Sequence, residues 1–178
     1  MQRTFKYFDL LMAIFVAVLL ISNIASLKIV ELFGFSFDAG TLHFLVSYIL
    51  GDLITEIYGL GHAKRVIWMG FFATFLMSTT LILVVILPPA SDWPFQESFK
   101  NVFAITPRIV VASLLAFLVG SYSNAVIMDN LKNLCKGKYL WLRTISSTLV
   151  GEGLDTAIFV LVAFAGLMPV PLLISILW

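Results

Sequence analysis

The sequence predicts an all-α, polytopic bundle of transmembrane helices. Of the 178 residues, 61% are hydrophobic and only 12% are charged, and the mean hydropathy is +1.04. A soluble globular domain has about half of its residues apolar and about a quarter charged. The apolar residues also form long continuous runs, whereas an outer-membrane barrel has segments of about ten residues with alternating polarity. We therefore expect a single transmembrane domain over residues 1–178.

Five apolar runs are long enough to cross a bilayer. They cover residues 9–27, 40–58, 66–87, 105–128 and 140–167. After Pro169 and Pro171, only residues 172–178 remain apolar. Seven residues at about 1.5 Å each cannot cross a hydrocarbon core of about 30 Å. We expect either a truncated sixth span or a tail that lies at the membrane interface.

The segment between the third and fourth spans has a pattern of its own. Phe95, Phe99 and Phe103 recur every four residues, with polar residues between them. This pattern predicts a short amphipathic helix over residues 92–104 that lies on the membrane surface. It is either a plain connector or a lid over a cavity.

The basic residues predict the orientation of the chain. Eight of the 11 Lys and Arg residues lie before the first span, between the second and third, or between the fourth and fifth and at the start of the fifth. These three places are on the same side if all five spans cross. Because short cytoplasmic loops are enriched in Lys and Arg, we expect a cytoplasmic N-terminus in a bacterial-type inner membrane.

The second and fifth spans share a polar pattern. Ser47, Gly51 and Asp52 have counterparts 100 residues later in Ser147, Gly151 and Glu152. The Ser22-Asn23 pair also recurs, as Ser123-Asn124. Since the matching spans run in opposite directions, one interpretation is an inverted repeat of three helices and three helices, as in many transporters. The alternative is a chance match, because small and polar residues are common in membrane helices.

Acidic residues inside apolar spans are the main candidates for function. A charged side chain at the centre of a membrane helix costs about 2.5–3.5 kcal/mol on insertion-type scales. Asp52 and Glu56 share one face of the second span with Tyr48 and Thr55, and Glu152 and Asp155 share a face of the fifth span with Phe159. We expect these acids to bind a ligand. The alternative is structural: the acids pair with basic residues and hold helices together. The candidates for that pairing are Lys28, Arg108 and Arg143.

Several chemistries lack their sequence signals. The chain has no nucleophile motif of the G-x-S-x-G type, no H-E-x-x-H motif and no Walker motif. We therefore expect no enzyme activity, no metal and no cofactor. Asn23 and Asn124 remain as polar candidates, either for ligand binding or for hydrogen bonds between helices.

Several blocks of the sequence together resemble one known family. They are residues 22–28, 47–59, 65–68, 107–108 with 112–113, and 141–147 followed by Asp155 and Phe159. They resemble the queuosine-precursor transporters, which are vitamin-uptake-type integral membrane proteins, over most of the chain. The resemblance implies six membrane helices and import of 7-deazaguanine bases, such as 7-cyano-7-deazaguanine or its 7-aminomethyl relative, for tRNA modification.

A deazaguanine ligand would suit the acidic and aromatic candidates. A carboxylate can accept the N–H donors of a guanine-like edge, and aromatic rings stack on its flat face. Tyr48, Trp68 and Phe159 are the candidates for stacking. The predicted binding residues are Asn23, Tyr48, Asp52, Thr55, Glu56, Trp68, Asn124, Glu152, Asp155 and Phe159. Which of the acids contacts the ligand is left open by the sequence.

Two other functions remain open. The chain could be a substrate-binding membrane subunit that needs a separate ATPase, or a structural membrane protein whose acids only join helices. The expected partners are the lipid bilayer and a small 7-deazaguanine molecule. No nucleic-acid partner is expected, and a homo-oligomer is an option that the sequence does not decide.

Overall fold

A computed structural model of the chain describes residues 7–32, 35–103 and 107–164. The order of the elements is α1 (Phe8–Ala25), β1 (Ile29–Leu32), β2 (Phe35–Asp38), α2 (Thr41–Tyr58), α3 (Leu60–Ile86), α4 (Gln96–Phe103), α5 (Pro107–Leu134) and α6 (Leu140–Phe164). The predicted tail over residues 172–178 lies outside the described residues, as do Arg3 and Lys6, the two basic residues before the first predicted span.

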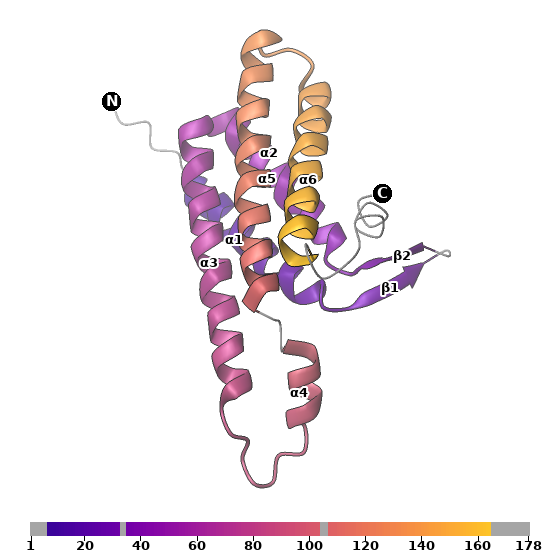
Figure 1. The fold of residues 1–178 in the computed structure, drawn as a ribbon. Coiled ribbons are helices and arrows are strands. Elements are labelled where there is room, and N and C mark those ends of the chain that lie inside the picture. The colour runs from indigo at the N-terminus through magenta and orange to yellow at the C-terminus, as the bar shows by residue number, and fades with distance from the viewer. Residues whose placement is uncertain (1–6, 33–34, 104–106, 165–178) are drawn as a thin grey trace.

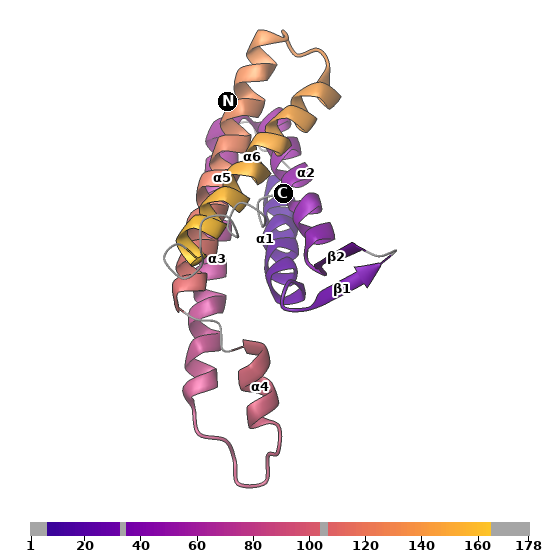
Figure 2. The ribbon, with the colours of Figure 1, turned by 45° about the vertical axis from the view of Figure 1, so that its right-hand side comes forward.

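Five long helices form a bundle, which confirms the predicted fold class (Figure 1). Helices α3, α5 and α6 run side by side, and α1 and α2 lie together on one side of them (Figure 2). The strands β1 and β2 project away from the bundle, and α4 lies beyond one end of it. The molecule is therefore a helical bundle with two small appendages.

Ring contacts and hydrogen bonds identify the two ends of the bundle. The Phe8 ring at the start of α1 lies 5.3 Å from the Tyr58 ring at the end of α2 and 5.0 Å from the His62 ring in α3, between centroids. At the other end of α1, Ser22 Oγ donates to the carbonyl oxygen of Gly40 at 2.9 Å. Helices α1 and α2 are therefore antiparallel neighbours. We call the end with Phe8 and Tyr58 the basic end, because Lys64 and Arg65 follow there.

Two helices, α3 and α5, extend well beyond the predicted apolar spans. Helix α3 begins at Leu60, six residues before the predicted start, and α5 ends at Leu134, six residues after the predicted end. Gly59, with φ of +83°, is the single residue that separates α2 from α3. Hydropathy marks the part of a helix that suits lipid, whereas backbone hydrogen bonding continues into the polar residues next to it.

Four helices of the described residues are long and apolar enough to span a membrane, namely α1, α3, α5 and α6. Helix α2, the second predicted span, is not among them. Its 18 residues include His43, Asp52 and Glu56, which lower its hydropathy. The span at α2 therefore stays a prediction that rests on its position in the bundle.

A two-stranded hairpin between α1 and α2 was not expected from the sequence. Strands β1 and β2 are antiparallel, with Ile29 opposite Asp38 and Leu32 opposite Phe35. The β-branched pair Ile29-Val30 and the aromatic residues of Phe35-Ser36-Phe37 are residue types that favour strands. This signal was missed because the segment is short and adjoins two apolar helices.

Helix α4 is shorter than the predicted amphipathic helix. It begins at Gln96 rather than at residue 92. Pro94 disfavours helical backbone at Trp93, so the turn before α4 cannot join the helix. The predicted aromatic face exists nonetheless: the Phe99 and Phe103 ring centroids lie 4.8 Å apart, and Trp93 lies 6.0 Å from Phe99.

Close helix packing depends on two glycines where α5 meets α6. A Cβ added to Gly120 would lie 2.8 Å from the carbonyl oxygen of Gly151 and 2.8 Å from the Cβ of Asp155. A Cβ added to Gly151 would lie 3.1 Å from the carbonyl oxygen of Gly120. Small residues let membrane helices approach closely, so this pair of glycines sets the distance between α5 and α6.

We expect a Gly120→Ala variant to be less stable than the native protein. The new methyl group meets backbone and the Asp155 side chain, and such overpacking costs about 1–3 kcal/mol. A thermal melt in detergent should show a lower midpoint. Gly153→Ala is the matched control, since a Cβ there meets nothing within 4 Å. Equal melting of the two variants would contradict the packing argument.

Candidate functional site

The acids of α2 point into the bundle. Asp52 is 3% exposed and Tyr48, one turn before it, is 8% exposed. Thr55 is fully buried, and its hydroxyl donates to the carbonyl oxygen of Gly51 within the same helix at 2.8 Å. One face of α2 therefore carries its polar side chains toward α5 and α6, as the spacing predicts.

Asp52 is bound by neighbouring helices. Asn124 Nδ2 of α5 donates to Asp52 Oδ1 at 2.8 Å. The hydroxyls of Ser147 and Thr148, both on α6, lie 3.4 Å from Oδ1 and 3.5 Å from Oδ2. The Asp52 carboxylate thus joins α2 to α5 and α6. The Ser147 contact also links the two segments of the proposed repeat, which itself stays a prediction.

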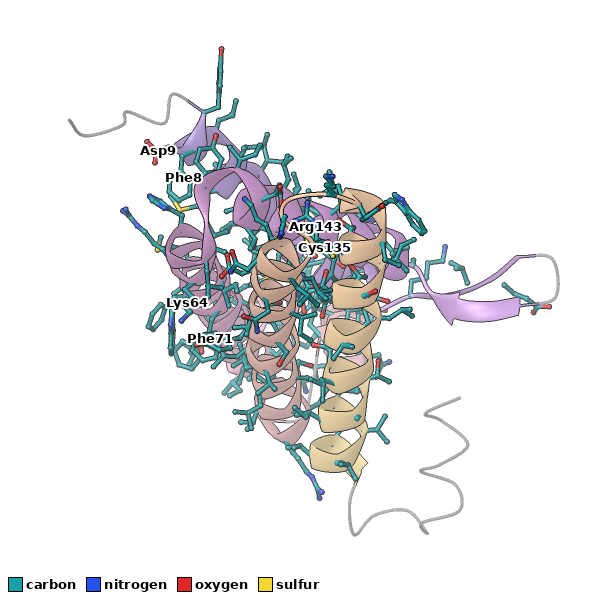
Figure 3. The ribbon with its side chains drawn as sticks, turned by 90° about the horizontal axis from the view of Figure 1, so that it is seen from above. Phe8, Asp9, Lys64, Phe71, Cys135 and Arg143 are labelled. Atoms are coloured by element: carbon teal, nitrogen blue, oxygen red, sulfur yellow. The ribbon has the colours of Figure 1, made fainter. Side chains whose placement is uncertain are left out.

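Glu56 forms an ion-paired cluster at the basic end. Arg143 of α6 donates two hydrogen bonds to its carboxylate, at 2.7 and 3.3 Å. Lys132 of α5 approaches the same carboxylate at 3.6 Å and donates to the backbone carbonyl of Glu56. Arg143 is 1% exposed and also donates to the carbonyl oxygens of Gly137 and Lys138. Figure 3 looks along the bundle from this end, where Arg143 lies beside the turn between α5 and α6.

A cavity of about 410 Å³ lies between the helices. Its volume is in the range of pockets for small organic ligands. Four aromatic residues line it: Phe44, Tyr48, Phe117 and Phe159. Seven polar or acidic residues also line it: Asn23, Ser26, Thr74, Ser113, Glu152, Asp155 and Thr156. We call this space the acidic cavity.

Within the described part of the chain, neither Glu152 nor Asp155 has a hydrogen-bond or ion-pair partner. This distinguishes them from Asp52 and Glu56. Asp155 lies close to the Tyr48 hydroxyl, because a Cβ at Gly120 would be within 3.0 Å of both side chains. The acidic cavity therefore offers two free carboxylates, one of them beside an aromatic hydroxyl.

A second cavity of about 330 Å³ adjoins the acidic cavity. The two share Asn23, Ser26, Thr74, Ser113 and Phe159. The remainder of the second cavity is mostly apolar and includes Leu81, Ile109 and Leu114, toward the end of the bundle opposite the basic end. Small polar side chains therefore lie where the two cavities meet.

The predicted binding residues divide into two groups. The acidic cavity includes Asn23, Tyr48, Glu152, Asp155 and Phe159. Outside both large cavities lie Asp52, Thr55, Glu56, Trp68 and Asn124. Each of these five contacts another part of the protein. Asp52 and Asn124 are hydrogen-bonded to each other, and Glu56 is paired with Arg143. Thr55 donates to its own helix, and Trp68 packs against other aromatic rings.

Trp68 is outside the site for a clear physical reason. It is 47% exposed on the outer face of α3 and packs against the rings of Phe71 and Phe72. An outward aromatic residue near a helix end suits the membrane interface.

The basic residues that were candidates for pairing with the acids have different surroundings. Arg108 Nε donates to the carbonyl oxygen of Val162 on α6 at 2.8 Å, whereas Lys28 is exposed.

Sequence reasoning missed Thr74, Ser113 and Phe44. Thr74 and Ser113 are isolated small polar residues in apolar helices, a pattern too common in membrane helices to single them out. Phe44 precedes Tyr48 by one turn of α2, so the spacing of α2 could have identified it.

The fold defines a polytopic helical membrane protein with a cavity between its helices. A sequence profile of the family described as "Putative vitamin uptake transporter" matches residues 38–178, and the chain belongs to this family. This confirms the resemblance that the sequence motifs predicted. No solved structure matches the chain significantly.

Three curated relatives have similar sequences. A "Probable queuosine precursor transporter" of Bacillus subtilis (strain 168) is 30% identical over 83% of this chain and 65% of its own length. A protein with the same description from Haemophilus influenzae is 28% identical over 74% of the chain and 54% of its own length. The "Queuosine precursor transporter" of Escherichia coli (strain K12) is 24% identical over 76% of this chain and 58% of its own length. The chain thus spans about half to two thirds of the length of these relatives.

We expect an Arg143→Ala variant to lose substantial stability. It removes the bidentate partner of Glu56, whose side chain is 24% exposed and which keeps Lys132 nearby. A hydrogen bond to a charged group contributes about 1.5–3 kcal/mol, so we expect a loss of that order. A thermal melt in detergent should show a clearly lower midpoint. Arg65→Ala is the control, because Arg65 is an exposed basic residue near the same end. An Arg143→Ala variant that melts like the control would show that the ion pair is not needed.

Proposed function

We propose that the chain is a transporter that imports 7-deazaguanine precursors of queuosine through the inner membrane, with the acidic cavity as its binding site. The observation that carries this proposal is the pair of unpaired carboxylates, Glu152 and Asp155, in a cavity that also has aromatic walls. The printed descriptions of the three relatives support the same substrate class.

The chemistry of the cavity suits a guanine-like base. The edge of such a base carries a ring N–H and an amino group, and one carboxylate can accept both donors. Asp155 is the candidate for this contact, because it lies beside the Tyr48 hydroxyl. Tyr48 and Phe159 are candidates for stacking, which contributes about 1–3 kcal/mol per base in nucleic-acid complexes.

Transport would follow from movement of the helices around this cavity. Substrate sites in many transporters lie near the bilayer midplane between helical repeats, and one half rocks against the other. The Glu56–Arg143 pair joins α2 to α6 at the basic end. During transport, these two helices would either move together or separate by breaking this pair. The concentration of basic residues at that end supports a cytoplasmic N-terminus, and the carrier chemistry requires no catalytic group.

We expect Asp155→Asn to weaken binding of both deazaguanine bases by about 10- to 100-fold, because a hydrogen bond to a charged acceptor contributes about 1.5–3 kcal/mol. Titration calorimetry with 7-cyano-7-deazaguanine on purified protein in detergent measures the loss. Asp92→Asn is the matched control, since Asp92 is an exposed aspartate in the loop before α4. Unchanged affinity in a folded Asp155→Asn variant would contradict this role of Asp155.

Liposomes that contain only the purified chain test whether it is a complete carrier. We expect uptake of labelled base without ATP or a second protein, because a secondary carrier needs only the substrate gradient or a coupled ion. Protein-free liposomes are the control. Saturable binding without uptake would instead favour a binding subunit that depends on a separate ATPase.

A further inference from the structure

The described residues that line the acidic cavity do not balance its negative charge. Glu152 and Asp155 lie three residues apart on one face of α6, and both line the cavity. No Lys, Arg or His is among the described residues that line it. Two neighbouring carboxylates without a positive partner disfavour each other's charged form. A positively charged group of a ligand would relieve this.

Two other acids inside the bundle, Glu56 and Asp52, have partners within the protein. Glu56 is paired with Arg143 and Lys132, and Asp52 accepts a hydrogen bond from Asn124. The bundle therefore supplies donors or positive charges to the acids that hold helices together. The two acids that line the cavity lack such partners among the described residues. Within the described residues, Glu152 and Asp155 are therefore the acids of this cavity that remain available to a ligand.

A second, independent feature of the same cavity points to a ligand. The Thr74 hydroxyl of α3 is buried, with the residue 4% exposed, and has no hydrogen-bond partner within the described part of the chain. Thr74 lines the acidic cavity. Leaving a buried polar group unsatisfied costs about 1–3 kcal/mol. A polar ligand in the cavity would provide the missing partner.

We propose that the acidic cavity selects a flat base that carries a protonated amine, and that Glu152 is the residue that binds the ammonium group. This inference rests on the proposed function, in which Asp155 accepts the donors at the edge of the base. A neutral base uses one carboxylate and leaves the other unpaired. A base with an ammonium group would contact both carboxylates. A polar atom of its ring could then form a hydrogen bond with the Thr74 hydroxyl.

The two candidate precursors differ in this group. The 7-aminomethyl base has a primary amine, which is protonated at neutral pH as lysine is, with a pKa near 10. The 7-cyano base has a neutral nitrile at the same position. An ammonium–carboxylate contact is about twice as strong as a neutral hydrogen bond. We therefore expect the native protein to bind the aminomethyl base about tenfold more tightly than the cyano base.

The test is the ratio of the two dissociation constants in three proteins. Titration calorimetry is carried out with both bases on the native chain, on Glu152→Gln and on Glu97→Gln. Glu97 is the matched control because it lies on α4, with its side chain 82% exposed. Glutamine keeps the size and hydrogen-bonding capacity of the side chain and removes only its charge. We expect Glu152→Gln to weaken binding of the aminomethyl base about tenfold and to leave binding of the cyano base unchanged, while Glu97→Gln behaves as the native protein.

Each other outcome overturns a defined part of the proposal. Equal affinity of the native protein for the two bases, or an unchanged ratio in Glu152→Gln, would show that Glu152 does not select an amine. Asp155→Asn is titrated with both bases as a fourth protein, and a ratio that collapses in it but not in Glu152→Gln would reject the assignment to Glu152. If the folded native protein binds neither base, the proposed function is wrong and this inference falls with it.

Discussion

The bundle depends on the cost of leaving a carboxylate unpaired in an apolar medium. Helix α2 brings Asp52 and Glu56 into the interior, and each has to find a partner there. Asn124 and Arg143 meet this need from α5 and α6, so these pairs fix the position of α2 along and around its axis. In a bilayer, where water cannot substitute for a lost partner, polar contacts of this kind specify which helices lie together.

The same constraint separates the structural acids from those available for binding. The close approach of α5 and α6 at Gly120 and Gly151 brings Asp155 next to the Tyr48 hydroxyl. Glu152 and Asp155 line the acidic cavity, where neither has a hydrogen-bond or ion-pair partner among the described residues. The paired acids thus hold α2 against α5 and α6, and this arrangement of helices leaves Glu152 and Asp155 at the wall of the acidic cavity.

Much of the site could be predicted from residue type and spacing. An acid in an apolar helix is costly, so Asp52, Glu56, Glu152 and Asp155 were identifiable as important without coordinates. Their separate roles were not, because a carboxylate that binds a neighbouring helix and one that binds a ligand have the same sequence pattern. Trp68 illustrates the limit in another way: its residue type suits stacking, but it lies on the outward face of α3.

The sequence by itself determined the class of protein, the positions of most helices and the family, because hydropathy and local motifs need no knowledge of distant contacts. It also determined that acids of α2 and α6 are central. Only the tertiary structure decided that Asp52 and Glu56 are bound within the protein, that Thr74 belongs to the cavity and that β1 and β2 form a hairpin. The contacts of the acids and the lining of the cavity join residues up to 96 positions apart, such as Thr148 with Asp52, which spacing along one helix cannot reveal. The hairpin is local, but its strands of four residues are too short for a clear pattern.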